Sequence, residues 1–144
     1  MTGQPQFSSG YINGIVLDPA NLEVTFLNLY TGWVWTQPGT CVTNGSNSRY
    51  VTDLWQTGWY VYSDSPTWYT NCNGSVNYSY TEFANVAFCY VVYGTYVPTW
   101  VYYWPIQLQG WQNGSLYGNF YWMIGGSQCS SWLKPTYQMN RLVN

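Results

Sequence analysis

The chain has 144 residues, of which 22% are aromatic and only 6% are charged, whereas ordinary soluble domains contain about 25% charged residues. This length suits one domain that is large enough to bury a core. The formal net charge of −2 excludes the basic surface that nucleic-acid binding requires. The sequence contains no run of about 18 apolar residues, so we expect no membrane span.

Short apolar runs alternate with turn residues along the chain. Residues 1–9 are polar and lack periodicity, so we expect a flexible arm ahead of one domain that covers residues 10–144. We expect strands at Tyr11–Leu17, Leu22–Tyr30, Trp33–Thr36, Tyr50–Tyr62, Thr67–Thr70, Val76–Phe83, Asn85–Tyr93, Thr95–Trp104, Leu116–Ile124 and Trp132–Val143. We expect turns at Asp18–Asn21, Ser63–Pro66, Asn71–Gly74 and Gln112–Ser115, and a polar loop over residues 37–49.

The longest apolar stretch is Cys89–Trp111, which contains no charged residue. Its β-branched and aromatic residues alternate as they do in a strand. One face would carry Tyr96, Pro98, Trp100, Tyr102 and Trp104, and the other Val97, Thr99, Val101 and Tyr103. Because both faces are largely apolar, at least one must be covered by another sheet, a neighbouring subunit or a ligand.

The spacing of these runs indicates the fold class. No segment shows a sustained 3.6-residue period, and the expected strands recur at intervals of about 8–15 residues. This pattern predicts an all-β, single-domain antiparallel β-sandwich or jelly roll with an aromatic-rich core. The last strand contains Pro135, so we expect it at a sheet edge.

The four cysteines, Cys41, Cys72, Cys89 and Cys129, are widely spaced. They form no C-x-x-C pair and the chain has no histidine, so we expect no metal site. Two disulfides are predicted, with three possible pairings, and the alternative is four buried thiols in a reducing compartment. Disulfides favour an extracellular, cell-surface or virion-surface location.

Four sequons favour the same location and are candidate glycosylation sites: Asn44-Gly-Ser, Asn73-Gly-Ser, Asn77-Tyr-Ser and Asn113-Gly-Ser. Three of them are also Asn-Gly pairs, which hairpin turns use at positions of positive φ. The same residues therefore indicate either glycosylation or turn formation.

Groups that could carry catalysis are few. The acids are Asp18, Glu23, Asp53, Asp64 and Glu82, and the bases are Arg49, Lys134 and Arg141. Without histidine the chain has no Ser-His or Cys-His pair, and it has no phosphate-binding loop. Asp53 and Asp64 could face each other as glycosidase carboxylates do, but the Ser-Asp-Ser-Pro setting of Asp64 favours a turn cap. We therefore expect a non-catalytic protein without a cofactor.

One local pattern resembles a known enzyme family. Trp33-Val34, Thr40-Cys41 and Gln56-Thr57-Gly58-Trp59, with Tyr62 and Asp64, are similar to the early part of the glutamic (eqolisin-type) peptidases. Those are acid-active β-sandwich enzymes without a catalytic histidine that use a Gln and a Glu. The resemblance covers residues 33–64, with a gap between Cys41 and Gln56, and implies that Gln56 matches the catalytic Gln. The only Glu after it is Glu82, earlier than the family's Glu, so we expect similarity of fold without the activity.

The tryptophans offer a second kind of site, because aromatic rings stack on sugars. The candidates are Trp35, Trp55, Trp59, Trp68, Trp100, Trp104 and Trp111. Most of the ten tryptophans are expected in the core. A carbohydrate-binding module with Trp100, Tyr102 and Trp104 at its surface is therefore the alternative function.

The preferred hypothesis is self-assembly. Strands that are apolar on both faces indicate a buried subunit contact, so the expected partners are copies of the same chain in an extracellular filament or a virion surface layer. Tyr11, Ile12, Ile15 and Val16 follow the arm and could add a strand to a neighbour's sheet, whereas a hairpin with Leu22–Tyr30 is the intrachain alternative. The composition resembles that of surface proteins from hot, acidic habitats, because few ionisable groups limit the loss of stability at low pH.

Overall fold

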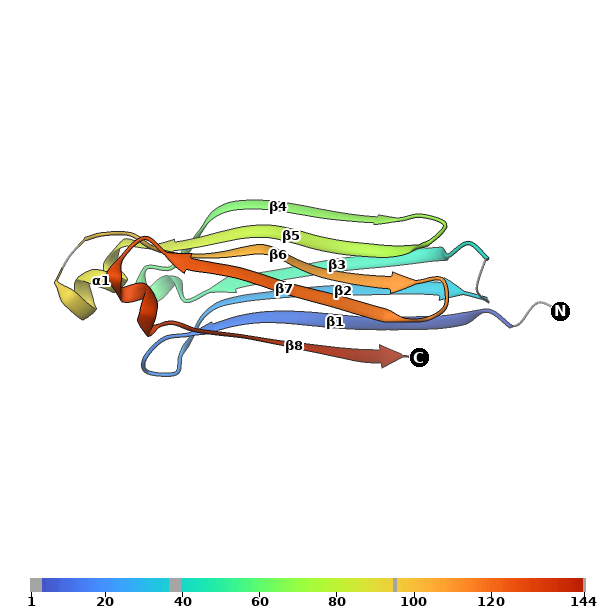
Figure 1. The fold of residues 1–144 in the computed structure, drawn as a ribbon, viewed down its shortest axis with the longest axis horizontal. Helices are drawn as coiled ribbons and strands as arrows, with labels where there is room; N and C mark the ends of the chain where they lie inside the picture. Colours follow the sequence, from blue (N-terminus) through green and yellow to red (C-terminus); the bar gives the residue numbers. More distant parts are fainter. Residues whose placement is uncertain (1–3, 37–39, 95, 144) are drawn as a thin grey trace.

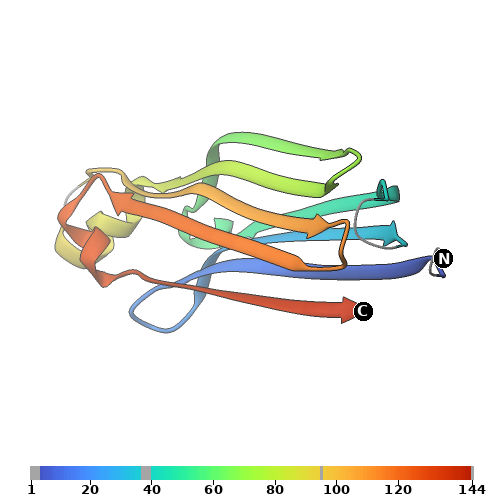
Figure 2. The ribbon, with the colours of Figure 1, turned by 45° about the vertical axis from the view of Figure 1, so that its right-hand side comes forward.

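The computed structural model describes residues 4–36, 40–94 and 96–143. It is a β-sandwich of two four-stranded antiparallel sheets, which confirms the predicted fold class. The strands run along the long axis of the molecule, and the helical segments gather at one end (Figure 1, Figure 2).

The elements have the following bounds. Sheet A contains, in spatial order, β3 (Thr43–Asp53), β2 (Glu23–Trp35), β1 (Gln6–Leu17) and β8 (Lys134–Val143). Sheet B contains β4 (Tyr60–Thr70), β5 (Gly74–Asn85), β6 (Thr99–Trp111) and β7 (Leu116–Gly125). The helical segments are η1 (Trp55–Thr57), α1 (Val86–Tyr93) and η2 (Gln128–Trp132). In the described parts of the chain, no helix has the length and apolar character needed to cross a membrane.

Most neighbouring strands are consecutive in the sequence. β1–β2–β3 and β4–β5–β6–β7 are meanders, and β8 returns to sheet A beside β1. This connectivity differs from the paired Greek keys of a jelly roll. Of the two predicted architectures, the chain therefore forms the simple β-sandwich. β8 pairs with β1 alone and is an edge strand, as its Pro135 predicted.

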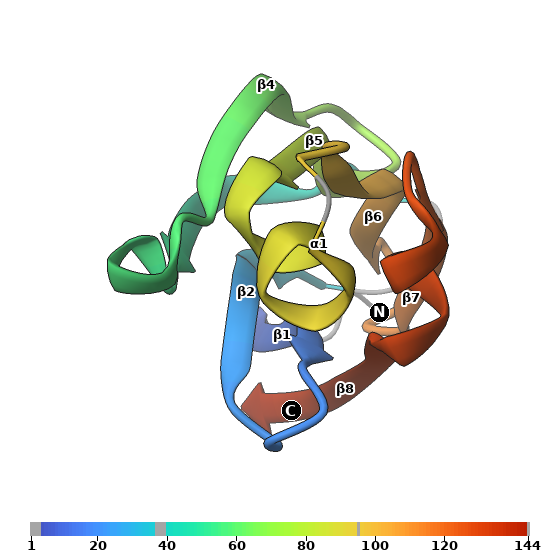
Figure 3. The same ribbon diagram turned by 90° about the vertical axis from the view of Figure 1, so that its left-hand side faces the viewer.

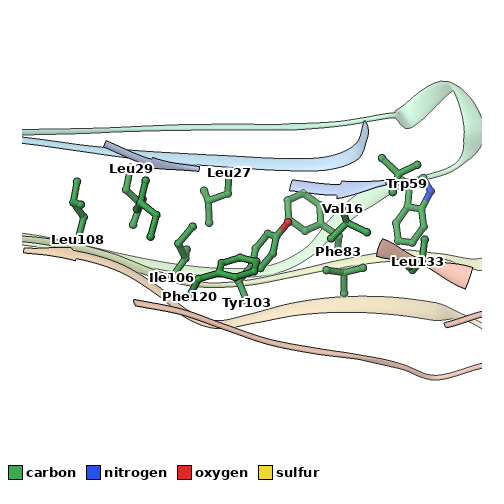
Figure 4. Close-up of a cluster of buried hydrophobic side chains, with 13 residues drawn as sticks. Val16, Leu27, Leu29, Trp59, Phe83, Tyr103, Ile106, Leu108, Phe120 and Leu133 are labelled. Carbon is green, nitrogen blue, oxygen red and sulfur yellow. The ribbon is translucent and has the colours of Figure 1, made fainter. Parts of the chain in front are cut away.

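Apolar side chains from both sheets fill much of the space between them (Figure 4). The largest fully buried ones include Ile12, Val16, Leu27 and Leu29 of sheet A, and Phe83, Tyr103, Ile106 and Leu108 of sheet B. The hydroxyl groups of Tyr103 and Thr25 form a 2.9 Å hydrogen bond between the sheets. Burial raises the pKa of Tyr103 well above its ordinary value, and the bond with Thr25 opposes that rise only in part. Tyr103 is therefore a neutral core residue at neutral and acid pH.

β5 turns a row of buried polar side chains toward sheet A, which we call the polar ladder: Ser75, Asn77, Ser79 and Thr81. The Nδ2 atom of Asn77 donates to the backbone carbonyl of Tyr30 at 2.9 Å and to that of Ser48 at 2.7 Å. The hydroxyl group of Ser75 donates to Oδ1 of Asn47 at 3.1 Å. These bonds reach β2 and β3, so on this side the two sheets are joined by polar contacts.

The polar ladder explains why β3 was missed. Residues 37–49 were expected to form a loop, but β3 begins at Thr43, and residues 37–39 lie outside the described residues. The first half of β3 contains no apolar residue, so the sequence shows no alternation of apolar and polar positions there. Its interior contacts are hydrogen bonds instead, and the expectation of a loop was wrong for residues 43–49.

The segment Asn85–Tyr93 was expected to be a strand, and this prediction was also wrong. Residues 86–93 form α1, which lies across the end of the sandwich (Figure 3). The Oδ1 atom of Asn85 accepts a 3.0 Å hydrogen bond from the backbone N–H of Phe88, as an N-cap does. Gly94 ends the helix in the left-handed conformation, with φ 74°. The N-cap at Asn85 and the glycine after the helix therefore determine the structure of this segment, although the residues between them have the composition of a strand.

Several strand boundaries differ from the prediction, such as that of β8, which begins at Lys134 because Trp132 ends η2. β1 begins at Gln6, so residues 6–9 extend sheet A instead of forming an arm. β4 runs through the expected turn at Ser63–Pro66, because Pro66 lies on an edge strand and its missing N–H costs no central ladder bond. The expected strand Tyr50–Tyr62 is interrupted by η1.

Two disulfides confirm the cysteine prediction and settle the pairing. Cys41 is joined to Cys72, and Cys89 to Cys129. The first bond links the chain entering β3 to the β4–β5 turn, and the second links α1 to η2. Such bonds form and persist in oxidising environments, which indicates where this chain matures.

Peptide mapping without a reductant should recover the pairs Cys41–Cys72 and Cys89–Cys129. The intact mass should lie four hydrogen atoms below that of the reduced chain, two for each of the two disulfides. Replacing both cysteines of either pair by Ser should lower the free energy of unfolding by about 2–5 kcal/mol, because the unfolded chain gains freedom. Four alkylatable thiols in the native protein would contradict the pairing.

The Thr25–Tyr103 bond can be tested by a double-mutant cycle. Tyr103→Phe should lower the free energy of unfolding by about 1–3 kcal/mol, because it leaves the buried hydroxyl group of Thr25 unpaired. Thr25→Val combined with Tyr103→Phe should recover much of that loss, because both polar partners are then removed. Urea unfolding measures the three variants, and strictly additive losses would show that the two residues do not interact.

Candidate functional site

The outer face of sheet B carries a row of large aromatic side chains. Alternate residues of β6 from Thr99 to Tyr103 are fully buried against sheet A. Trp100, Tyr102 and Trp104 therefore point outward, because side chains alternate across a strand. This is the alternation that the sequence predicted, although β6 begins at Thr99 and the residues before it precede the strand.

Neighbouring strands extend this surface. Its aromatic members are Tyr69 of β4, Tyr78 and Tyr80 of β5, Trp100, Tyr102 and Trp104 of β6, and Tyr117 and Tyr121 of β7. We call this set the aromatic face. The helical segments lie beyond the strand ends and leave it uncovered among the described residues (Figure 1, Figure 2).

Three rings lie in one row across the middle of the aromatic face. The strand register shifts at Tyr80 of β5 and at Trp104–Pro105 of β6, which brings Tyr80, Trp104 and Tyr121 to the same level. Trp104 is 52% exposed and Tyr121 is 56% exposed. The rings of Trp104 and Tyr102 lie nearly parallel, with centroids 6.0 Å apart and 14° between their planes. Trp104 and Tyr121 thus expose about half of their surface in one row with the half-buried Tyr80.

The aromatic face carries almost no charge. Strands β4 to β7 contain only two charged residues, Asp64 and Glu82, and Asp64 points inward. Glu82 lies between Ser63 and Tyr102 in the strand register, and the hydroxyl group of Ser63 donates to its Oε2 atom at 3.5 Å. Such a surface suits contact with another uncharged surface, because little charge has to lose its hydration.

Few of the tryptophans lie in the core, so the expectation that most of them are core residues was wrong. Of the ten tryptophans, only Trp33 and Trp59 are among the buried core residues. The exposed ones are Trp55, Trp68, Trp104, Trp111, Trp122 and Trp132. Aliphatic residues, Phe83, Tyr103 and Phe120 fill the interior instead. The chain therefore has more aromatic surface than its own fold requires.

Gln56 and Glu82 lie in different places. Gln56 belongs to η1, where it lines a groove of about 710 Å³ together with Trp55 and Trp59. Glu82 is absent from that lining and belongs to the outer face of sheet B. Among the described residues of the groove, Asp18 supplies the only carboxylate. Its Oδ1 atom accepts hydrogen bonds from two backbone N–H groups of the β1–β2 turn, which is a structural role.

Asp64 faces the interior, so the expectation that it caps a turn was wrong. It forms an ion pair with Arg49 of β3. Its Oδ1 atom also accepts a 2.8 Å hydrogen bond from the hydroxyl group of Thr81 and a 3.2 Å bond from that of Ser79. Asp64 thus meets a cation and the polar ladder rather than Asp53, whose pKa is raised by burial at the end of β3.

β1 occupies the centre of sheet A. Ile12 and Val16 are fully buried, while Tyr11 and Ile15 are half-buried on the outer side of the sheet. β1 pairs with β2 on one side and with β8 on the other, all within one chain. The intrachain hairpin is therefore the arrangement found, and the expected transfer of this strand to a neighbour would require it to leave the core.

Asn77 is not an accessible sequon in the folded chain. It is fully buried, and the Nδ2 atom to which a glycan would be attached donates to two backbone carbonyls. The tyrosine and serine that follow it lie on opposite faces of β5. The Asn77 side chain joins the two sheets and cannot carry a glycan in the folded chain, so the expectation of a glycosylation site at Asn77 was wrong.

The described residues contain no group of His, Cys, Asp and Glu side chains suited to hold a metal ion. Comparisons with protein-family models, with curated proteins and with solved structures return no match. The function must therefore be inferred from the surfaces of the chain itself.

The ion pair between Asp64 and Arg49 gives a stability test. Asp64→Ala should lower the free energy of unfolding by about 1–3 kcal/mol, because it leaves Arg49 without its counter-charge and removes the acceptor that the hydroxyl groups of Ser79 and Thr81 share. Arg49→Met combined with Asp64→Leu should cost less, because neither charge of this partly buried pair is then left without its partner. Ser65→Ala, on the outward side of the same strand, is the matched control. Equal urea midpoints for Asp64→Ala and Ser65→Ala would refute this role.

Proposed function

We propose that this chain is a non-catalytic structural protein that assembles with copies of itself through the aromatic face of sheet B. The observation that carries the proposal is the row formed by the half-buried Tyr80 and the exposed Trp104 and Tyr121, on a sheet whose opposite side already has a filled core. Contiguous exposed apolar surface of this kind marks interaction sites. Tyr and Trp are also the residues enriched at protein interfaces.

A second copy is the partner that this surface suits best. The face is nearly uncharged and rich in hydroxyl-bearing rings, so two copies can approach without burying opposed charges. Gln107 and Gln109 lie in register with Tyr78 and Val76 and add hydrogen-bonding groups between the rings. These features favour a layer or filament of like subunits over a partner that is recognised by charge.

The location follows from the same observations. Two disulfides indicate an oxidising environment, and we extend this to the cell surface, an extracellular filament or the surface of a virion. The chain has five acidic and three basic residues, so protonation of carboxylates at low pH removes few stabilising charges. Such a chain suits a surface exposed to acid.

Charges placed on the aromatic face should prevent assembly. Trp104→Glu combined with Tyr121→Glu should weaken self-association by more than about a hundredfold, because each unpaired charge buried in the interface costs about 3 kcal/mol or more. Tyr50→Glu is the matched control, because Tyr50 is 60% exposed on sheet A and lies outside the aromatic face. Sedimentation velocity and negative-stain images report the assembly state of the full chain.

The wild-type chain and the Tyr50→Glu variant should form ordered assemblies, whereas the double variant should remain monomeric with an unchanged circular dichroism spectrum. A monodisperse wild-type monomer at high protein concentration, at both neutral and acid pH, would refute the proposal. Assembly by the double variant would show that another surface makes the contact.

Carbohydrate binding is the second candidate, and the parallel rings of Tyr102 and Trp104 favour it. The exposed side of this ring pair can contact the apolar face of a sugar, and Gln107 lies on the same face of β6. A monomeric wild type that binds a glycan, and loses this binding in Trp104→Ala, would support this function. The absence of any glycan ligand for the wild type would remove it.

A further inference from the structure

Three of the four sequons, which are far apart in the sequence, meet at one end of the sandwich. Asn44 lies at the start of β3, Asn73 in the β4–β5 turn and Asn113 in the β6–β7 turn. All three side chains are exposed. This end lies opposite α1, as the ribbon colours for these residue numbers show (Figure 1).

Direct contacts hold the three turns together. The Cys41–Cys72 disulfide and a 2.9 Å hydrogen bond from the N–H of Val42 to the carbonyl of Cys72 join the start of β3 to the β4–β5 turn. The N–H of Gln112 donates to the carbonyl of Asn73 at 2.9 Å, which joins that turn to the β6–β7 turn. Each sequon asparagine is therefore at, or within two residues of, a link to another turn.

The hydroxyl residues of the sequons differ in access. Ser46 and Ser115, which complete the sequons of Asn44 and Asn113, are exposed. Ser75, which completes the sequon of Asn73, is fully buried in the polar ladder. A transferase that needs the serine hydroxyl can therefore reach Asn44 and Asn113 in the folded chain, but it must reach Asn73 before β5 joins the sandwich.

We propose that Asn44, Asn73 and Asn113 carry N-linked glycans that form one glycan-covered end. The Asn77 sequon is structural and unmodified in the folded protein, because a glycan on its Nδ2 atom would keep this side chain out of the interior and prevent its two hydrogen bonds. In the transfer step the Nδ2 atom attacks the anomeric carbon of an oligosaccharide carried on a lipid pyrophosphate. The bond from that carbon to the pyrophosphate oxygen breaks, the new N–C bond forms, and Nδ2 releases one proton. The lipid pyrophosphate is the leaving group, and no oxidant or reductant is needed.

One aromatic side chain lies where it can support these glycans. Trp111 is 43% exposed, precedes Asn113 by two residues and lines a pocket of about 230 Å³ together with Asn73 and Tyr69. A sugar attached at Asn73 can place its apolar face on this ring. The modified end would then be shielded by carbohydrate, so contacts between copies are confined to the sheet faces and the α1 end.

The test is glycan mapping on the full chain, both isolated from its native source and secreted from a host that performs N-glycosylation. Enzymatic removal of the glycans converts each modified Asn to Asp, and peptide mass spectrometry locates the change. Asn44 and Asn113 should be modified in most molecules, Asn73 in a smaller fraction and Asn77 in none. Folded, unmodified chain presented to the transferase should be modified at Asn44 and Asn113 alone.

Single variants separate the sites. Asn44→Gln, Asn73→Gln and Asn113→Gln should each remove one glycan and leave the disulfides and the fold intact. Ser79→Ala is the matched control, because it removes only the Asn77 sequon and should leave the glycan pattern unchanged. Correctly disulfide-bonded chain without glycans at Asn44 and Asn113, or with a glycan at Asn77, would overturn the proposal. Either result would leave the self-assembly proposal standing, because that proposal rests on Tyr80, Trp104 and Tyr121 in the middle of sheet B and not on the turns that carry the sequons.

Discussion

The contact between the two sheets divides the interior into an apolar part and a polar part, and the rest of the structure follows from this division. β5 contributes to both, because Phe83 lies in the apolar core while Ser75 to Thr81 form the polar ladder. Buried hydroxyl and amide groups are stable only when they are hydrogen-bonded. The edge strands β3 and β4 supply partners through Asn47, the carbonyl of Ser48 and Asp64. A strand as polar as β3 can therefore be part of the sandwich.

This division also accounts for the aromatic surplus outside. The ladder contributes small side chains to the space between the sheets, and the apolar part is filled largely by Leu, Ile, Val and Phe. The rings of Trp104, Tyr80 and Tyr121 lie on the outer side of sheet B, where the fold gives them no covering layer. Exposed single aromatic residues are ordinary on protein surfaces, but a contiguous uncharged set is not. The surplus is better explained by a contact outside the chain.

The sequence predicted those parts of the fold in which one rule decides the outcome. Alternation in β6 correctly placed Trp100, Tyr102 and Trp104 on one face, and the Asn113-Gly114 pair correctly marked a hairpin, with Gly114 at φ 85°. α1 was missed because its composition is that of a strand, and only the cap at Asn85 and the glycine after the helix identify it.

The aromatic face was predicted in part, whereas its extension over β5 and β7 depends on strand register, which the sequence does not specify. A usable signal existed for the polar ladder, since polar residues recur at every second position from Ser75 to Thr81, with Val76, Tyr78 and Tyr80 between them.

The disulfides complete the same arrangement at the two ends, where packing between long strands cannot act. Cys41–Cys72 joins the entry of sheet A to a turn of sheet B, and Cys89–Cys129 fixes α1 to the segment that leads into β8. The middle is held by the core and the polar ladder, and the ends by covalent bonds, so neither depends on surface ion pairs. The side chains on the outer faces of the sheets are therefore not needed to stabilise the fold. A chain built in this way can place uncharged rings on one face and modifiable turns at one end, and each surface can serve recognition without weakening the sandwich.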